Sequence, residues 1–163
     1  MANILGSELI TNGEFTGDAS GWDLGTGWAY VTNNLVATNA TANVSQSNVA
    51  VVDDATYQLT YTLSGYVDGS YRFFIWGDSG AKRAVTEART ANGNYTETFK
   101  ISALSAGTAG LLSLQTLVDG SVTIDNISIR QVISAGKVKR KRRRIRYYEP
   151  WEYELGDPFN KDS

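Results

Sequence analysis

The sequence of 163 residues predicts an all-β domain, a β-sandwich or barrel, followed by an extended C-terminal arm. Three observations favour this fold class. Residues 1–134 combine Val, Leu, Ile, Tyr and Trp with many Thr, Ser, Asn and Gly, a mixture typical of strands and turns. Turn sequences such as VDGS recur between short apolar runs. No segment has a convincing helical spacing of apolar residues, so many short strands are expected.

The expected strands follow one another along the whole domain. Three short candidates come first, at residues 27–31, 34–37 and 41–46. Residues 56–64 (TYQLTYTLS) give the clearest signal, because large apolar side chains alternate with Thr and Gln as in a half-buried strand. Four further strands are predicted at 70–76, 94–102, 109–118 and 120–132.

The last predicted strand contains an irregularity. In residues 120–132 the apolar side chains before and after Asp125-Asn126 have opposite parity. This slip indicates a β-bulge at Asp125-Asn126. The alternative is a strand with both faces covered, in which parity carries little meaning.

A change of composition at Ser134-Ala135-Gly136 predicts two parts, a domain of residues 1–134 and an arm of residues 135–163. Residues 1–136 hold six basic and twelve acidic side chains. Residues 137–146 hold eight basic side chains and no acid, and residues 147–163 hold one base and five acids. This division favours docking of the basic block on an acidic surface, its own or a neighbour's.

Several classes of function are excluded or disfavoured by composition. Cysteine and histidine are both absent, which rules out disulfides, thiolate metal sites, cysteine nucleophiles and histidine bases. Paired carboxylates remain conceivable in a glycosidase, but the acids lie mostly in turn sequences, and we expect no enzymatic activity. The sequence shows neither a signal-peptide pattern nor a stretch long enough to span a membrane, so no membrane partner is expected.

Two stretches carry a resemblance to a known fold. Residues 8–24 (ELITNGEFTGDASGWDL) look like its opening, with an apolar pair, Asn-Gly, an acid-Phe step and a Gly-Trp. Residues 122–132 (VTIDNISIRQV) look like its closing strand. Residues 8–132 thus resemble the jelly-roll β-sandwich of the carbohydrate-binding modules of glycoside hydrolases, and similar domains occur in bacteriophage virion proteins. The resemblance implies a jelly roll whose first and last strands lie close together.

The same resemblance implies a structural calcium between the opening motif and the last strand. Its candidate ligands are Asn12, Glu14, Thr16 and Asp125, with Asp18 as a further oxygen donor. The family usually places an acid directly after the Phe, whereas Thr16 stands there in this chain. The alternative is a plain turn at Asn12 and a carboxylate of Asp125 that caps the bulge. No other cofactor is expected.

Residues 70–76 carry the candidate carbohydrate-binding surface. Alternation places Arg72, Phe74 and Trp76 on one face of this strand and three apolar side chains on the other. If the apolar set is core, the first set presents two aromatic rings and a donor, with Ser113 and Gln115 as polar neighbours. The alternative is that Phe74 and Trp76 are covered by a loop or by a partner subunit.

The arm admits three kinds of partner. Its basic block and tyrosines suit nucleic acid, but the acids that follow would repel phosphate. Its composition also fits a nuclear-import signal, for which a phage-like domain gives no reason. A protein partner fits best, because basic side chains can meet carboxylates while aromatic ones fill pockets. The predicted docking residues are Lys137, Lys139, Arg140, Lys141, Arg142, Arg143, Arg144, Arg146, Tyr147, Tyr148, Trp151, Tyr153 and Phe159.

These observations lead to one functional prediction and one alternative. The prediction is a structural protein of a phage particle, located in the virion, that decorates the capsid or builds a head or tail appendage. Its arm would dock on other virion subunits or on copies of the same chain, as a homo-oligomer. The alternative is a carbohydrate-binding module that recognises cell-surface glycans through Arg72, Phe74, Trp76 and Gln115.

Overall fold

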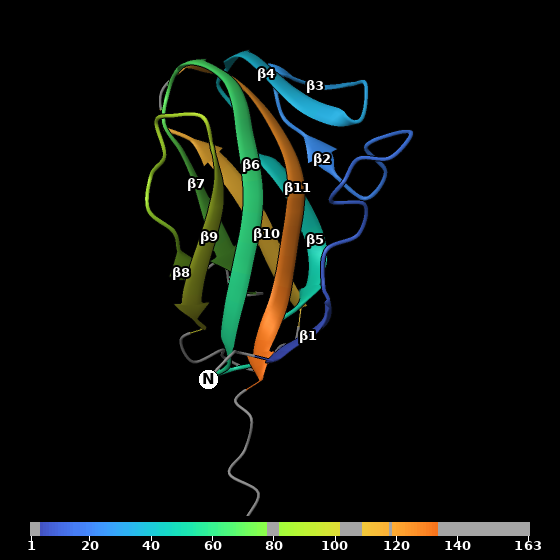
Figure 1. The fold of residues 1–163 in the computed structure, drawn as a ribbon, viewed down its shortest axis with the longest axis vertical. Helices are drawn as coiled ribbons and strands as arrows, with labels where there is room; N and C mark the ends of the chain where they lie inside the picture. Colours follow the sequence, from blue (N-terminus) through green and yellow to red (C-terminus); the bar gives the residue numbers. More distant parts are fainter. Residues whose placement is uncertain (1–3, 78–81, 102–108, 118, 134–163) are drawn as a thin grey trace, which may run out of the picture.

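The chain folds into two antiparallel sheets packed face to face in the computed structural model, which describes residues 4–77, 82–101, 109–117 and 119–133 (Figure 1). Over these residues there is no helix, and hence none able to cross a membrane. The strands are β1 (Ile4–Glu8), β2 (Asp23–Leu24), β3 (Trp28–Val31), β4 (Asn34–Ala40), β5 (Val44–Ala50), β6 (Thr56–Asp68), β7 (Tyr71–Trp76), β8 (Lys82–Val85), β9 (Gly93–Lys100), β10 (Ala109–Thr116) and β11 (Gly120–Ile133).

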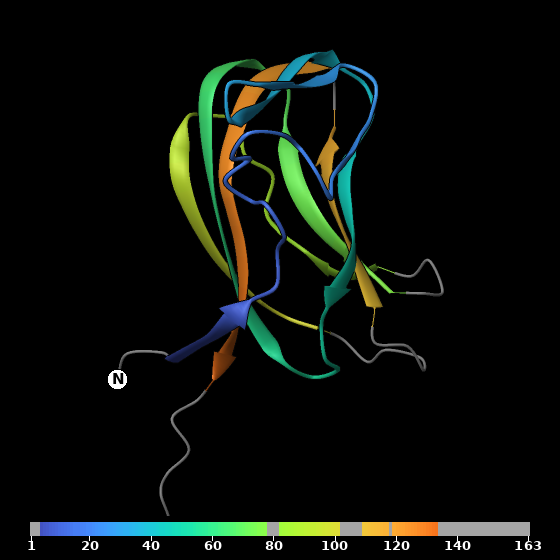
Figure 2. The ribbon, with the colours of Figure 1, turned by 90° about the vertical axis from the view of Figure 1, so that its right-hand side faces the viewer.

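The two sheets form the layers of a jelly roll. The six-stranded sheet has the order β3-β4-β11-β6-β9, and β1 also pairs with β11. The five-stranded sheet has the order β2-β5-β10-β7-β8. Figure 2 shows the two layers from the side, with the core between them. The predicted all-β sandwich is therefore confirmed, and its jelly-roll form is the one that the resemblance implied.

Strand β6 supplies much of the core through strict alternation. Tyr57, Leu59, Tyr61 and Leu63 are all at most 2% exposed, while the Thr and Gln residues between them are half-buried on the outer face. This confirms the faces that the sequence predicted for residues 56–64. Because each buried side chain of this size contributes roughly 1.5–3 kcal/mol by leaving water, these four residues anchor the sheet.

The bulge predicted in the last strand is present. The register of β11 against β6 shifts between Asp125 and Ser128, and Asn126 has a φ of 56°. Asparagine tolerates this left-handed conformation better than most residues. The shift lets Ile124 and Ile127, which have opposite parity, both enter the core, at 0% and 3% exposure.

The beginning and the end of the domain lie side by side, as the resemblance implied. Strand β1 pairs antiparallel with β11, and the Leu9 amide donates to the Ile129 carbonyl over 3.0 Å. Further along, the Ile127 amide donates to the Gly13 carbonyl over 2.9 Å. A Cβ on Gly13 would clash with the backbone oxygen of Ile127, so only glycine permits this close approach.

Candidate functional site

The outer side of the five-stranded sheet carries the candidate site, which we call the β7 face. It consists of Arg72, Phe74 and Trp76 on β7, Gln115 on β10 and Lys82 on β8. Register places them together, since Arg72 lies opposite Gln115 and Trp76 lies opposite Lys82. The other three side chains of β7 point into the core, as predicted from alternation: Tyr71, Phe73 and Ile75.

Phe74 forms the base of the β7 face. Its ring is only 2% exposed although it points away from the core. The Arg72 guanidinium lies 4.7 Å and the Lys82 ammonium 4.3 Å from the centre of this ring, and the Trp76 ring lies 5.6 Å away. Phe74 therefore packs against its neighbours and does not offer its ring to a ligand. Of the two aromatic rings predicted to contact a sugar, only Trp76 can do so.

Trp76 is the accessible ring of the β7 face. Its side chain is half-buried, and the Lys82 ammonium lies 5.3 Å from the centre of its ring. Tryptophan rings offer a large flat apolar surface at low cost in side-chain entropy. Such a surface suits the apolar face of a sugar ring.

A side-chain hydrogen bond orients the polar part of the β7 face. Both Nε and Nη2 of Arg72 donate to Oε1 of Gln115, over 3.3 and 3.2 Å. This contact fixes the guanidinium over Phe74. Ser113, which was expected to be a polar neighbour, is on the same side of the sheet but only 4% exposed. Besides the exposed Lys82, Gln115 and Arg72 are thus the polar groups that a ligand can reach.

A hollow of about 510 Å³ lies at the β5 edge of the same sheet. Asp23 and Ser45 line it from strands β2 and β5, and Trp22 lines it from the preceding loop. Gln46 also lines this hollow. The Gln46 carboxamide accepts a hydrogen bond from the Thr11 amide over 2.8 Å and donates one to the Thr11 carbonyl over 2.7 Å. The hollow adds polar groups to the sheet that bears Trp76.

The predicted calcium ligands do not form one set. Asn12, Glu14 and Thr16 line a hollow of about 470 Å³ beside the six-stranded sheet, but Asp125 does not. The Asp125 carboxylate instead accepts from the amide of Asn126 over 2.7 Å. Asn12 donates from Nδ2 to Asp18, and within the described residues no three acidic side chains gather around one point. Asp125 thus does not line the hollow that Asn12, Glu14 and Thr16 share, and the calcium ion stays a prediction.

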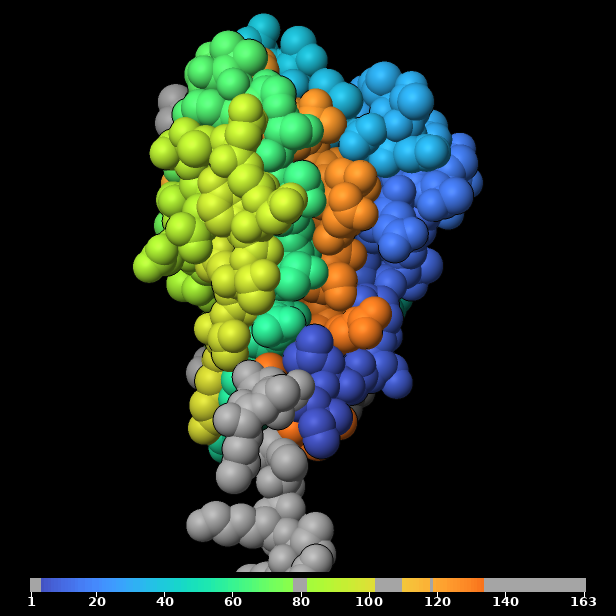
Figure 3. Space-filling view, in the orientation of Figure 1, coloured from blue at the N-terminus to red at the C-terminus, as the bar shows by residue number. Residues whose placement is uncertain are grey.

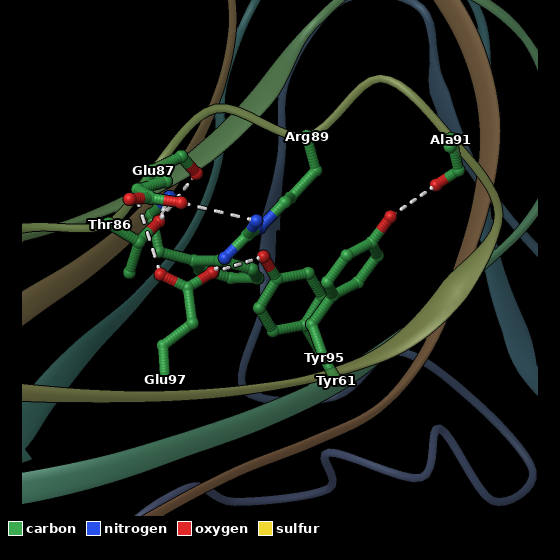
Figure 4. A network of polar contacts seen from close by, with 8 residues as sticks. Tyr61, Thr86, Glu87, Arg89, Ala91, Tyr95 and Glu97 are labelled. Atoms are coloured by element: carbon green, nitrogen blue, oxygen red, sulfur yellow. Dashed lines mark hydrogen bonds and ion pairs between the residues drawn. The ribbon is translucent and has the colours of Figure 1, made fainter.

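A polar network ties the segment after β8 to strands β6 and β9 (Figure 4). Oε1 of Glu97 accepts from the Tyr61 hydroxyl over 2.6 Å and pairs with Nε of Arg89 over 3.4 Å. Burial, followed by the hydrogen bond to Glu97 and by its charge, raises the pKa of Tyr61 well above the usual tyrosine value. Tyr61 therefore remains a hydrogen-bond donor at neutral pH. The groups of this network satisfy one another, which indicates a structural role.

The outer side of the six-stranded sheet differs from the β7 face. Figure 3 shows this side, with β9, β6 and β11 at the front. Short polar side chains cover β6 and β9 in paired rows, such as Thr60 opposite Thr96 and Gln58 opposite Thr98. No aromatic ring of these two strands points outward, since Tyr95 and Phe99 face the core with Glu97. The outer side of β6 and β9 therefore offers no stacking surface for a sugar.

The predicted docking arm, residues 135–163, lies outside the described residues, and so do all thirteen docking residues named from the sequence. The last described strand ends at Ile133. The boundary at residue 134 and the docking role stay predictions.

Solved structures with the same fold are mainly carbohydrate-binding modules. A family 4 module is 21% identical, covers 72% of this chain and 99% of its own, and superposes with a TM-score of 0.55. The N-terminal cellulose-binding domain of a Cellulomonas fimi β-1,4-glucanase is 20% identical over 78% of this chain and 99% of its own, with a TM-score of 0.57. The chain therefore has the jelly-roll fold of carbohydrate-binding modules.

One phage protein shares the fold as well. The enzymatically active part of tailspike protein 4 of bacteriophage CBA120 is 15% identical, with a TM-score of 0.54. The match covers 77% of this chain but only 21% of the tailspike chain. No protein-family model matches the sequence, and no curated protein matches it.

Proposed function

We propose that this protein is a non-catalytic carbohydrate-binding module that holds a sugar chain on the β7 face. The observation that carries the proposal is the half-buried ring of Trp76 beside Lys82, with the hydrogen-bonding groups of Arg72 and Gln115 further along the same face, beyond Phe74. One sugar ring would stack on Trp76, while hydroxyls of another sugar of the same chain bond to the guanidinium of Arg72 and the carboxamide of Gln115. The carbohydrate-binding modules among the structural neighbours support this function over the virion role.

The test is binding of the full chain to polysaccharides. Cellulose and xylan come first, because one structural neighbour is a cellulose-binding domain and another is a xylan-binding domain. Trp76→Ala removes the stacking surface and should weaken binding at least tenfold, measured by affinity electrophoresis and isothermal titration. Val85→Ala is the matched control, since Val85 lies on the same side of the sheet and is 51% exposed. The absence of binding to any polysaccharide, or full binding by Trp76→Ala, contradicts the proposal.

A second function rests on a separate observation, the eight basic side chains of residues 137–146 next to an aromatic and acidic segment. Such an arm suits docking on other subunits of a virion, or on copies of the same chain. The phage tailspike among the structural neighbours gives this role weak support. Its test is assembly, by comparing the oligomeric state of the full chain with that of a chain ending at Ser134.

A further inference from the structure

The two sheets of the sandwich differ in charge. The strands of the five-stranded sheet hold three basic side chains, Arg72, Lys82 and Arg83, and one acidic side chain, Asp23. The strands of the six-stranded sheet hold four acidic side chains and two basic ones. Half of the six basic residues before position 137 thus lie on β7 and β8 of an otherwise acidic domain.

The acid of the five-stranded sheet is far from these cations. Asp23 lies on β2, at the opposite edge of the sheet from β8. Three strand spacings separate β2 from β7, which is about 14 Å. Attraction over such a distance at an exposed surface is largely screened at physiological salt.

Arg72 and Lys82 also differ from the cations of the six-stranded sheet in their partners. Lys100 pairs with Asp54 over 2.7 Å, and Arg130 pairs with Glu8 over 3.1 Å. No carboxylate of the described residues lies within ion-pair distance of Arg72 or Lys82, which contact aromatic rings and Gln115 instead. Within the described residues, the charges of Arg72 and Lys82 are thus not neutralised by a carboxylate.

We propose that the sugar chain recognised by the β7 face is acidic and carries carboxylate groups, as uronic acids do. This inference rests on the proposed function and specifies its ligand. In a uronic acid the carboxylate is bonded directly to the sugar ring, so stacking on Trp76 brings it toward the Lys82 ammonium, 5.3 Å from the Trp76 ring centre. Ammonium and guanidinium groups form strong charge-assisted hydrogen bonds with carboxylates.

The experiment compares one ligand with and without its charge. The full chain, labelled with ¹⁵N, is titrated with tri-galacturonic acid and with the methyl ester of the same trimer. The indole N–H resonance of Trp76, identified by its loss in Trp76→Phe, reports binding at the β7 face and is insensitive to capture elsewhere on the chain. The acid should shift this resonance and bind at least tenfold more tightly than the ester.

Two variants locate the charge that matters. Lys82→Gln should weaken binding of the acid about tenfold, the loss of one charge-assisted hydrogen bond, and change ester binding little. Arg72→Gln also removes a donor to sugar hydroxyls, so it should weaken binding of both ligands, and of the acid more than of the ester. Lys100→Gln removes the same charge from the other sheet and should leave binding unchanged. Circular dichroism of each variant verifies the fold.

Each contrary result has a distinct meaning. Equal binding of acid and ester, with both lost in Trp76→Ala, overturns the acidic ligand but keeps the carbohydrate-binding function. Binding of the acid without a shift at Trp76, unaffected by Lys82→Gln, assigns capture to the basic arm and overturns the inference. If the protein binds a sulfated trisaccharide more tightly than the carboxylated one, carboxylate is not the group that the β7 face recognises, and the inference is overturned. If no sugar, neutral or acidic, binds, the proposed function itself fails.

Discussion

Glu8 shows how one side chain joins the two ends of the domain. Its Oε1 accepts from the amides of Ile10 and Ile129, over 3.0 and 2.9 Å. Its Oε2 accepts from the Ser128 hydroxyl and pairs with Nε of Arg130 over 3.1 Å. Burial alone raises the pKa of Glu8, but these hydrogen bonds together outweigh it, so the pKa is lowered.

The lowered pKa of Glu8 predicts how stability depends on pH. The folded state favours the ionised carboxylate, so its stabilisation is complete above the ordinary glutamate pKa of about 4.3 and is lost as pH falls through the lowered value. Glu8→Gln should reduce the free energy of unfolding by about 1–2 kcal/mol at pH 7 and by less at pH 3. Urea denaturation at both pH values measures this.

Glu14→Gln is the control for Glu8, because Glu14 lines the same hollow but is exposed and accepts no hydrogen bond from the described residues. Its free energy of unfolding should match that of the unmodified protein. An equal loss for Glu8→Gln at both pH values would contradict the assigned role of the charge.

At the scale of elements, strands that alternate buried and outward side chains could be predicted from the sequence, whereas β1, β2 and β8 could not. Strands β6, β7 and β11 bury alternate side chains against the other sheet, which leaves a period of two in the sequence. Strand β1 is mostly exposed, β2 has two residues, and β8 begins with two charged residues, so none leaves that pattern. The contribution of Lys82 to the covering of Phe74 was therefore missed, since the sequence analysis considered only a loop or a partner subunit as the cover.

The Glu97 network was missed for a related reason. Residues 94–102 were predicted as a strand, and Glu97 shares the inward parity of Tyr95 and Phe99. An acid among inward aromatic residues signals a need for polar partners. Its partners Tyr61 and Arg89 come from other segments, however, and their approach depends on the sheet register.

The network predicts a local change on loss of Glu97. The Tyr71 amide donates to the Arg89 carbonyl, and the Arg89 amide donates back, which fastens the segment after β8 to β7. Glu97→Ala leaves the Tyr61 hydroxyl without its acceptor and Arg89 with only the exposed Glu87, and it should cost about 2–3 kcal/mol. Hydrogen exchange should quicken at the amides of Tyr71 and Arg89.

Glu87→Ala separates this effect from simple loss of charge. Glu87 also pairs with Arg89, over 3.3 Å, but its side chain is 82% exposed. Exposed pairs contribute little, so both stability and exchange should be nearly unchanged. Equal exchange in Glu97→Ala and in the unmodified protein would show that the network does not hold the segment.

At the scale of the whole molecule, the sandwich and the arm have separable roles. Every core residue of the described part lies between Ile10 and Ile129, and the β7 face lies on strands far from the chain's last segment in sequence. The arm carries the strongest positive charge of the chain, whereas residues 1–136 have a net charge of −6. We therefore expect folding and the proposed sugar binding to reside in residues 1–134, and the proposed docking to reside in the arm.

A chain that ends at Ser134 tests this division. We expect its melting temperature to lie within about 3 °C of the full chain's, equivalent to about 1 kcal/mol, because no described core residue is removed. Its affinity for the sugar bound at the β7 face should be unchanged, while any assembly of the full chain, measured by analytical ultracentrifugation, should disappear. Unfolding of the shortened chain would assign the arm to the fold. Assembly that persists without the arm would place the docking surface on the sandwich. The short polar side chains on the outer side of β6 and β9 would then be the candidate surface, because the proposed sugar site lies on the other sheet.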